Sequence, residues 1–219
     1  MTRKKMPNTF GKGAKEHQKV VVVGLSKTGT SSLKVMLQEL GYSVCGPKKA
    51  LLAEVRGGNV AAIDATVEEY DAFEDWPWPL VYKEIHRKYG ENARFILTVR
   101  KDADTWYRSI ESHGYRTGVF NSMKNAYGYY RPFGRKDQFH KIYHDHNSEV
   151  MSYFAHSPHL LTQICLESGE GWEKLCNFLG HATPEKSVPH RNKTSAESKR
   201  LRRALNSLIA PIYARLPVR

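Results

Sequence analysis

The sequence predicts an α/β fold of the P-loop type, in which helices cover both faces of a mostly parallel sheet. Two stretches, Val20–Val23 and Ala93–Arg100, are rich in β-branched and other apolar residues, as expected for strands buried on both faces. A polar turn and a segment with helical spacing follow each of them, and strands that alternate with helices favour crossovers between parallel strands. The 219 residues and their 40% hydrophobic content fit a single domain of this kind.

The first half of the chain continues this alternation. Residues 1–18 are polar and have no period, so we expect a flexible basic lead-in before a single domain at 19–219. Glycines mark the ends of helical patterns, as Gly41 does after the segment that begins at Leu33. After the first strand we predict a helix at 33–40, a short strand at 42–45, a helix from Pro47 to Val55, a strand at 60–64 and a helix at 79–89.

The second half adds two more units of strand and helix, and two less regular segments. Acids near the start of 102–111 suit the positive end of a helix dipole. Residues 114–138 are rich in Gly, Tyr and Arg and break any period, which predicts a long mobile loop. The expected elements are a strand at 93–100, helices at 102–111 and 139–154, a strand at 160–166, a helix at 171–178 and a basic C-terminal helix at 195–215.

Composition excludes several classes of protein. The three cysteines show no CxxC spacing, so we expect neither a disulfide scaffold nor a structural zinc site. No apolar run approaches the roughly 20 residues of a membrane span, and no apolar segment follows the basic N-terminus as in a secretory signal. We therefore expect a cytoplasmic protein without a membrane partner, while the oligomeric state is left open.

The net charge of +12 comes from the two ends of the chain. Residues 1–19 hold six Lys and Arg against one acid, and residues 186–219 hold nine against one. The body between them carries 19 basic and 20 acidic residues and is near neutral. Because basic tails are commonly solvated chain ends, the charge alone does not predict a nucleic-acid partner.

The stretch Gly24–Ser31, between a predicted strand and a predicted helix, carries the strongest functional signal. Gly24 and Gly29 have the spacing of the GxxxxGK[ST] loop, whose backbone amides and helix dipole cradle phosphate. The lysine of that pattern is absent, since Thr30 occupies its position, while Lys27 lies inside the loop. We therefore expect the loop to bind a phosphate-like group without the usual lysine on a β- or γ-phosphate.

Residues 26–32, with the sequence SKTGTSS, resemble the 5′-phosphosulfate loop of sulfotransferases, commonly written PKSGTTW. Similar pieces follow in order within roughly residues 20–192: DWP at 75–77, YKE at 82–84, FILTVR at 95–100, WYRS at 106–109, GWEKLCNFLG at 171–180, and Pro189, His190 and Asn192. The ordered set resembles the small P-loop sulfotransferase-like group whose members often read GLxRTGTTSL and GWExLCxFLG.

This resemblance implies a reaction and a donor. Sulfotransferases of this kind transfer a sulfuryl group from 3′-phosphoadenosine 5′-phosphosulfate (PAPS) to a hydroxyl or amine, and they release 3′-phosphoadenosine 5′-phosphate (PAP). The implied partner is a small-molecule acceptor, and no metal is expected. The resemblance does not identify the acceptor.

The resemblance also implies roles for particular residues. Lys27 would bind the phosphosulfate and stabilise the charge that develops on the leaving phosphate. Arg100 and Ser109 would bind the 3′-phosphate, although their spacing of nine departs from the usual eight. Ser32 stands where many relatives have a Trp against the adenine, so the adenine contact is unassigned. The implied cofactor-binding set is Ser26, Lys27, Thr28, Gly29, Thr30, Ser31, Arg100, Ser109, Arg191 and Lys193.

The acceptor must lose a proton as its bond to sulfur forms, so a general base near Lys27 is expected. Asp75 is the first candidate, because it follows an acidic stretch and precedes a proline-containing turn. Glu84 and His86 share that neighbourhood in the sequence, and His113 ends the helix after FILTVR.

Other interpretations stay open at this point. A P-loop kinase or NTPase would need an acid for Mg²⁺, for which Asp64 is the candidate, and a non-catalytic nucleotide- or nucleic-acid-binding module would depend on the basic tails. The tyrosines of 114–138 fit a substrate lid or base stacking equally well. His140 and His144 share a helical face, but His146 does not and no HExxH glutamate lies between them, so we expect no metal site.

Overall fold

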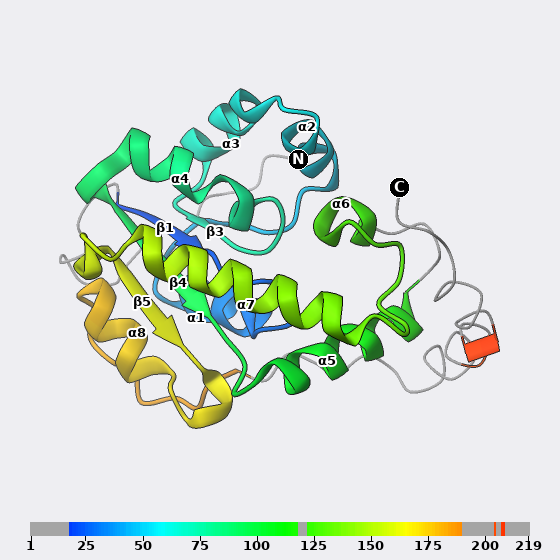
Figure 1. Ribbon diagram of the computed structural model, residues 1–219. Coiled ribbons are helices and arrows are strands. Elements are labelled where there is room, and N and C mark those ends of the chain that lie inside the picture. The colour runs from blue at the N-terminus through cyan, green and yellow to red at the C-terminus, as the bar shows by residue number, and fades with distance from the viewer. Residues whose placement is uncertain (1–17, 118–121, 190–203, 205–206, 209–219) are drawn as a thin grey trace, which may run out of the picture.

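The computed structural model describes residues 18–117, 122–189, 204 and 207–208. Its centre is a parallel sheet of five strands in the order β2-β3-β1-β4-β5 (Figure 1). The strands are β1 Lys19–Val22, β2 Val44–Cys45, β3 Ala72–Phe73, β4 Ala93–Thr98 and β5 Leu161–Ile164. The α/β class predicted from the sequence is confirmed, and every strand pair of this sheet is parallel.

The helices alternate with these strands along the chain. The α-helices are α1 Thr30–Glu39, α2 Lys49–Arg56, α3 Asp64–Glu69, α4 Trp78–Tyr89, α5 Ala103–Arg116, α6 Met123–Tyr127, α7 Lys136–Tyr153 and α8 Trp172–Leu179. Short 3₁₀ helices are η1 Val60–Ile63, η2 Gly90–Asn92, η3 Pro158–Leu160 and η4 Leu166–Ser168. Most of the predicted helices and strands are present, with ends shifted by a few residues.

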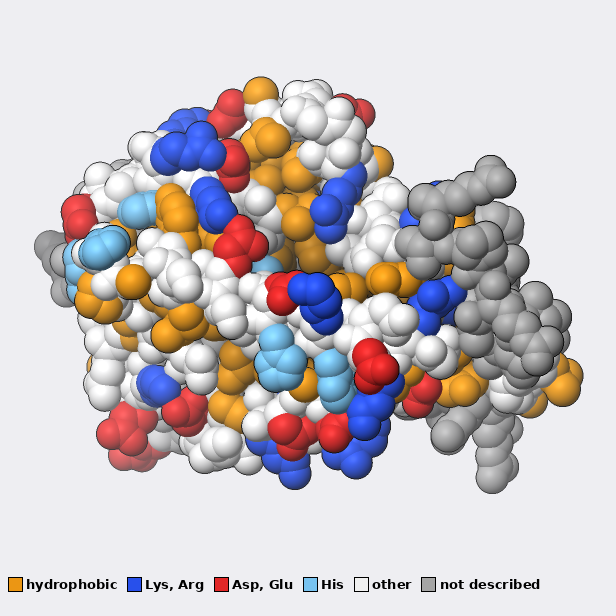
Figure 2. Space-filling view, viewed as in Figure 1, with side chains coloured by type: hydrophobic (Ala, Val, Ile, Leu, Met, Phe, Trp, Pro, Cys, Tyr) orange, Lys and Arg blue, Asp and Glu red, His pale blue; other side chains and the backbone are white. Residues whose placement is uncertain are grey.

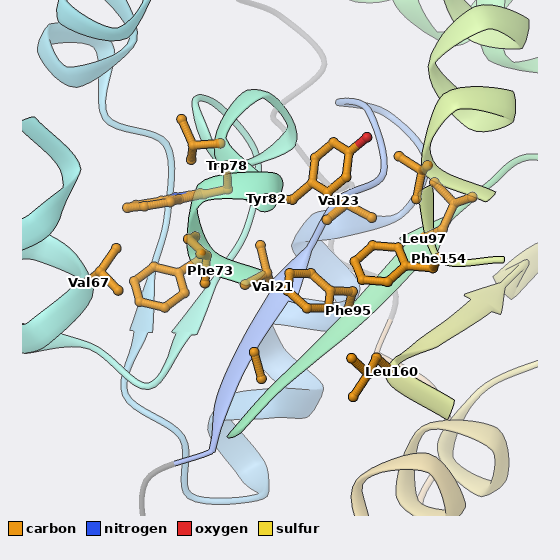
Figure 3. Close-up of a cluster of buried hydrophobic side chains, with 14 of the residues drawn as sticks. Val21, Val23, Val67, Phe73, Trp78, Tyr82, Phe95, Leu97, Phe154 and Leu160 are labelled. Carbon is orange, nitrogen blue, oxygen red and sulfur yellow. The ribbon is translucent and has the colours of Figure 1, made fainter. Parts of the chain in front are cut away.

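Apolar side chains cover both faces of the sheet. On one face, Val21 of β1 and Phe95 of β4 pack against Trp78 of α4 and against Phe154, which directly follows α7 (Figure 3). On the opposite face, the alternate residues of the same strands pack against α1 and α8. Burial on both faces explains why these strands read as continuous apolar runs.

The topology favours a binding site at the end of β1. This strand lies in the middle of the sheet, between β3 and β4. The chain first winds from β1 towards β2 and β3, and later crosses to β4 and β5 on the other side. In open parallel sheets, ligands bind at the carboxyl ends of the strands where the winding reverses. The loop at 24–29, directly after β1, lies at that point.

The predicted strand at 60–64 is wrong. Residues 60–63 form η1, and Asp64 begins α3. Ile63 and Val67 are both buried, and their spacing of four places them on one helical face, so packing favours a helical path here. The strand beside β1 is instead β3, whose two residues lie in an acidic stretch and are too few to form a recognisable pattern.

The predicted long loop at 114–138 is wrong in much of its described part. The helix α5 extends beyond Gly114, α6 lies within the segment, and α7 begins before its end. Buried Arg131 donates hydrogen bonds to the carbonyls of Gly114 (2.8 Å) and Thr117 (3.3 Å), which attach the segment to α5. Long-range packing thus orders a stretch whose sequence has no period.

Charged side chains of both signs are interspersed over the face shown in Figure 2. Oppositely charged side chains form ion pairs on the surface, as in Lys83–Glu149 and Lys141–Asp145. Most of the basic lead-in and of the predicted basic helix at 195–215 lies outside the described residues. Among the helices that the structure describes, none has an apolar stretch of the length needed to cross a membrane.

Candidate functional site

The loop at 24–29 has a conformation that only particular residues allow. A Cβ atom on Gly24 would lie 2.0 Å from Thr98 Oγ1 and 2.3 Å from the Thr98 carbonyl oxygen, so the loop backbone can contact β4 only through a glycine. Gly29 has a φ of 108°, in the left-handed region. The Thr28 hydroxyl lies 2.6 Å from the Leu25 carbonyl oxygen and 2.6 Å from Thr98 Oγ1, which fixes the loop against β4.

This loop leads directly into α1, whose first turn faces a cavity of about 520 Å³. The first amides of an α-helix have no partner within the helix and carry its positive dipole end. Thr30 and Ser31 line the cavity at this point. Its other walls come from the start of α2, the turn after β3, the helix α5 and the segment after β5. A helix N-terminus in such a position suits a bound anion.

Lys27 supplies a cation to this cavity. Its backbone φ is 74°, an uncommon value for a residue with a side chain, and such strain persists where the surrounding structure holds it. Burial, together with the nearby charges of Arg116 and Arg100, lowers the pKa of the Lys27 ammonium from its ordinary value, while Asp75 opposes this effect. An anion beside Lys27 would therefore relieve an unfavourable positive charge.

Arg100, just beyond β4, lies next to Lys27 and Ser109. Its Nε donates a hydrogen bond to the Lys27 carbonyl oxygen (2.8 Å), and a terminal nitrogen donates a long one to Ser109 Oγ (3.4 Å). The backbone N–H of Arg100 donates to the Tyr143 hydroxyl (2.9 Å). The spacing of nine residues thus still brings the guanidinium and hydroxyl of the predicted pair together. The Glu167 carboxylate forms an ion pair with the same guanidinium.

Asp75 lies in the turn after β3, in contact with the loop after β1. Its φ is 66°, and the Ser26 hydroxyl donates a short hydrogen bond to its Oδ1. The backbone N–H of Trp76 donates to the same oxygen (2.9 Å). Burial raises the pKa of the Asp75 carboxyl above its ordinary value, although these hydrogen bonds and Lys27 oppose the rise. A carboxyl group in this state can accept a proton more readily than an exposed one.

Glu74, which the sequence analysis did not single out, is buried directly beside Asp75. Its Oε1 lies 3.6 Å from Lys34 Nζ of α1, and its buried Oε2 has no hydrogen-bond partner within the described part of the chain. Burial and the neighbouring Asp75 raise the pKa of Glu74 to about 7. The sequence shows Glu74 only as a second acid before Asp75. Its place beside the site could be recognised only once β3 was known to pair with β1.

Two of the predicted base candidates lie away from the cavity. Glu84 forms an ion pair with Arg87 on the surface of α4. His86 Nδ1 lies 3.0 Å from the Tyr153 hydroxyl, and its ring packs against Phe95. Neither side chain lines the cavity, so the structure does not bring them to Lys27.

His113 of α5 does line the cavity. Burial and the charge of Lys27, with smaller contributions from Arg116 and Arg131, lower the pKa of His113 to about 4. The imidazole is therefore neutral at pH 7 and can exchange hydrogen bonds with a bound group without adding charge.

The remaining candidates are dispersed or lie outside the described residues. His146 Nε2 lies 2.7 Å from the Val23 carbonyl oxygen, whereas His140 pairs with Asp104. In the described residues, no group of three or more His, Cys, Asp or Glu side chains is placed to hold a metal ion. Asp64, the acid suggested for Mg²⁺, pairs with Lys88 and does not line the cavity. The candidates Arg191 and Lys193 fall outside the described residues.

Two comparisons with known proteins bear on the family of this chain. The sequence model of a family described as "Sulfotransferase domain" matches residues 19–197. The chain is also similar to a protein of Aspergillus versicolor named "Ava biosynthesis cluster protein M". The two sequences are 28% identical, and the alignment covers 78% of this chain and 80% of that protein.

Proposed function

This chain belongs to the sulfotransferase domain family, and from that premise we propose that it transfers a sulfuryl group from PAPS to a hydroxyl or amine of a small acceptor. One observation carries the proposal. Lys27, the N-terminus of α1, Asp75 and Arg100 line a single cavity. Arg100 is also hydrogen-bonded to Ser109, and Asp75 accepts a hydrogen bond from Ser26 of the loop after β1.

In the proposed complex, different groups of the protein bind the two phosphates of the donor. The amides of the first turn of α1, near Thr30 and Ser31, hold the 5′-phosphate. The Arg100 guanidinium and the Ser109 hydroxyl hold the 3′-phosphate, a dianion that suits a planar fork with several N–H donors. The candidates Arg191 and Lys193 would add cations to that phosphate. PAPS supplies the activated sulfuryl group.

The proposed chemical step is an in-line displacement at sulfur. The acceptor hydroxyl or amine loses its proton to the Asp75 carboxylate as its oxygen or nitrogen bonds to sulfur. The bond between sulfur and the bridging phosphate oxygen breaks, and PAP leaves with that electron pair. Lys27 stabilises the negative charge on the bridging oxygen and phosphate, a type of effect worth about 10²–10³ in rate.

A small acceptor is supported by two observations. The cavity of about 520 Å³ is partly apolar, with Pro47, Leu52 and Trp76 on the side of Asp75. The relative from Aspergillus versicolor is named after a biosynthesis cluster, and a small-molecule acceptor is in keeping with that name.

A thermal-shift experiment tests the donor assignment. The protein is heated with PAP and, separately, with ATP and Mg²⁺, at constant salt. Ligand at 100 times its Kd stabilises a protein by about 2.7 kcal/mol, which for a chain of this size raises Tm by about 5–11 °C. We expect this shift with PAP, and we expect Arg100→Ala to abolish it.

Arg108→Ala is the matched control, because Arg108 is an exposed arginine on α5 that donates to Thr105. It should leave the PAP shift unchanged. A shift with ATP and Mg²⁺ but not with PAP would refute the proposal and favour a kinase or NTPase. No shift with either ligand would favour a non-catalytic module.

A further inference from the structure

Each of the three nitrogens of the Arg100 guanidinium donates one hydrogen bond to another group of the protein. Its Nε donates to the Lys27 carbonyl oxygen, and one terminal nitrogen donates to Ser109 Oγ. The other terminal nitrogen pairs with Glu167 Oε1. The second carboxylate oxygen, Glu167 Oε2, accepts a long hydrogen bond from the backbone N–H of Lys101 (3.4 Å). A carboxylate that bridges a guanidinium and a backbone amide makes the contacts that a phosphate would make there.

Glu167 cannot move far from this position without changing the cavity wall. It lies in η4, whose Leu166 packs over the loop: a Cβ on Gly29 would lie 2.8 Å from Leu166 Cδ1. The turn is closed by hydrogen bonds from Ser168 N to the Cys165 carbonyl (3.0 Å) and from Gly169 N to the Leu166 carbonyl (3.3 Å). While this wall keeps its shape, Glu167 can release Arg100 by rotation of its side chain.

Solvent screens this ion pair only in part. The side chains of Arg100 and Glu167 keep 21% and 32% of their area exposed. A phosphate placed on Arg100 would therefore meet a negative charge at short range, and juxtaposed like charges weaken binding strongly. A ribose with a free 3′-hydroxyl would instead find a carboxylate able to accept its hydrogen bond, as acids do at other nucleotide sites.

We infer that Glu167 is a specificity-determining residue that weakens the binding of 3′-phosphorylated nucleotides relative to those with a 3′-hydroxyl. The inference rests on the proposed PAPS site and deepens it. Glu167 competes with the 3′-phosphate for Arg100, so the protein holds PAP less tightly than the cations alone would allow. Faster release of PAP after transfer is the consequence for turnover, since product release often limits kcat.

The test compares two nucleotides that differ at the 3′ position. Isothermal titration at constant salt and pH gives Kd for PAP and for adenosine 5′-monophosphate, with the wild type, Glu167→Gln and Glu167→Ala. We expect both variants to bind PAP about 10- to 100-fold tighter, because the competing negative charge is gone. Affinity for adenosine 5′-monophosphate should stay within about threefold or fall.

Glu173→Gln is the matched control. Glu173 is an exposed acid in the first turn of α8, so its loss changes the net charge equally without freeing Arg100. This control should leave both Kd values unchanged. Thermal unfolding without ligand confirms that each variant is folded, and the Ala variant covers the case in which the Gln amide keeps the bridge.

The outcomes separate this inference from the proposed function. If the wild type binds PAP in an Arg100-dependent way but both Glu167 variants bind it no tighter, the inference is refuted and the PAPS site stands. Equal gains for PAP and adenosine 5′-monophosphate would refute it as well, since they would reflect general charge. If neither the wild type nor the variants bind PAP, the proposed function fails and this inference fails with it.

Discussion

Two neighbouring turns, after β1 and after β3, form the centre of the cavity, and the chain encodes them in different ways. Each holds a charged residue in the left-handed region, Lys27 with a φ of 74° and Asp75 with a φ of 66°. The turn after β1 is surrounded in sequence by glycines and hydroxyl residues that fit its shape. The turn after β3 has no such neighbours, and its path depends on a residue 49 positions away, Ser26, which donates to Asp75.

The two turns differ in the contacts that offset the backbone strain of Lys27 and Asp75, both of which have a positive φ. A residue in the left-handed region without a glycine costs about 1–3 kcal/mol, which the rest of the structure must offset. For Lys27, its own carbonyl oxygen accepts a hydrogen bond from Arg100 (2.8 Å) and Thr28 anchors the loop to β4. Asp75 is held by the turn after β1, whose Ser26 hydroxyl donates a hydrogen bond to the Asp75 carboxylate. The shape of the turn after β3 therefore depends in part on the turn after β1.

The largest effect on kcat should come from removing the Lys27 ammonium, the cation in the turn after β1. We expect Lys27→Ala to lower kcat by up to about 10³-fold, because no other group would stabilise the charge on the leaving phosphate in the same place. Stability should not fall, since burial lowers the pKa of Lys27 and its charge is not favourable in the folded protein. Steady-state kinetics with PAPS and thermal unfolding measure both quantities.

Lys141→Ala, which removes a surface lysine paired with Asp145, is the control and should be neutral in both measurements. If Lys27→Ala kept more than a tenth of the wild-type kcat, the first turn would not contain the main electrostatic catalyst.

A smaller effect is expected in the second turn. Asp75→Asn should lower kcat by about 10²-fold, because the amide cannot take the acceptor proton but can keep the hydrogen bonds from Ser26 and Trp76. Burial raises the pKa of the Asp75 carboxyl, so the wild-type rate should fall as pH drops through that raised value. A raised pKa also means that the folded protein disfavours the ionised Asp75 carboxylate, which therefore lowers stability at neutral pH. Asp75→Asn, which carries no charge, should therefore unfold at a higher Tm.

Asp64→Asn is the matched control, because Asp64 is an exposed acid that a metal-dependent NTPase would have used. Retained activity in this variant is expected. A large loss of activity in Asp64→Asn together with little loss in Asp75→Asn would reverse the assignment of the two acids.

The contrast between the two turns also explains which parts of the site could be predicted from the sequence and which could not. The position of the loop at 24–29 and the proximity of Arg100 to Ser109 could be predicted, because each follows a buried apolar strand and consists of residues close in sequence. Glu74 and Glu167 were not, since their roles depend on which strands pair and which turn lies over Arg100. The two residues of β3 carry no periodic signal, and the apolar run at 60–64 looked like the missing strand.

Packing at long range accounts for the other difference between prediction and structure. The described parts of the segment at 114–138 are held by contacts with α5 and not by a periodic apolar pattern of their own. The Tyr107 hydroxyl donates to the Pro132 carbonyl (2.9 Å), and the tilted rings of Tyr115 and Phe133 are in contact, with centroids 4.2 Å apart. Such contacts join residues 18 or more positions apart, where local sequence pattern gives no information.

The smallest effect on kcat is expected for Glu74→Gln in the turn after β3, where we expect a change in stability instead. Glu74 is buried, and burial together with Asp75 raises its pKa from the ordinary 4.5 to about 7. The folded protein therefore binds an extra proton between these values, and wild-type stability should fall as pH rises through this window. Glu74→Gln removes the ionisation, so we expect it to be more stable than the wild type by about 3 kcal/mol at pH 8 and similar to it at pH 4.5.

Urea unfolding from pH 4.5 to 8.5 measures this difference, with Glu69→Gln, an exposed acid on α3, as the control that should follow the wild-type curve. Parallel curves for Glu74→Gln and the wild type would mean that Lys34 stabilises the Glu74 carboxylate enough to cancel its burial. Because Glu74 does not line the cavity, kcat should change far less than in Asp75→Asn. Two adjacent acids would then differ in role: Asp75 in proton transfer, and Glu74 in the pH dependence of the fold beneath it.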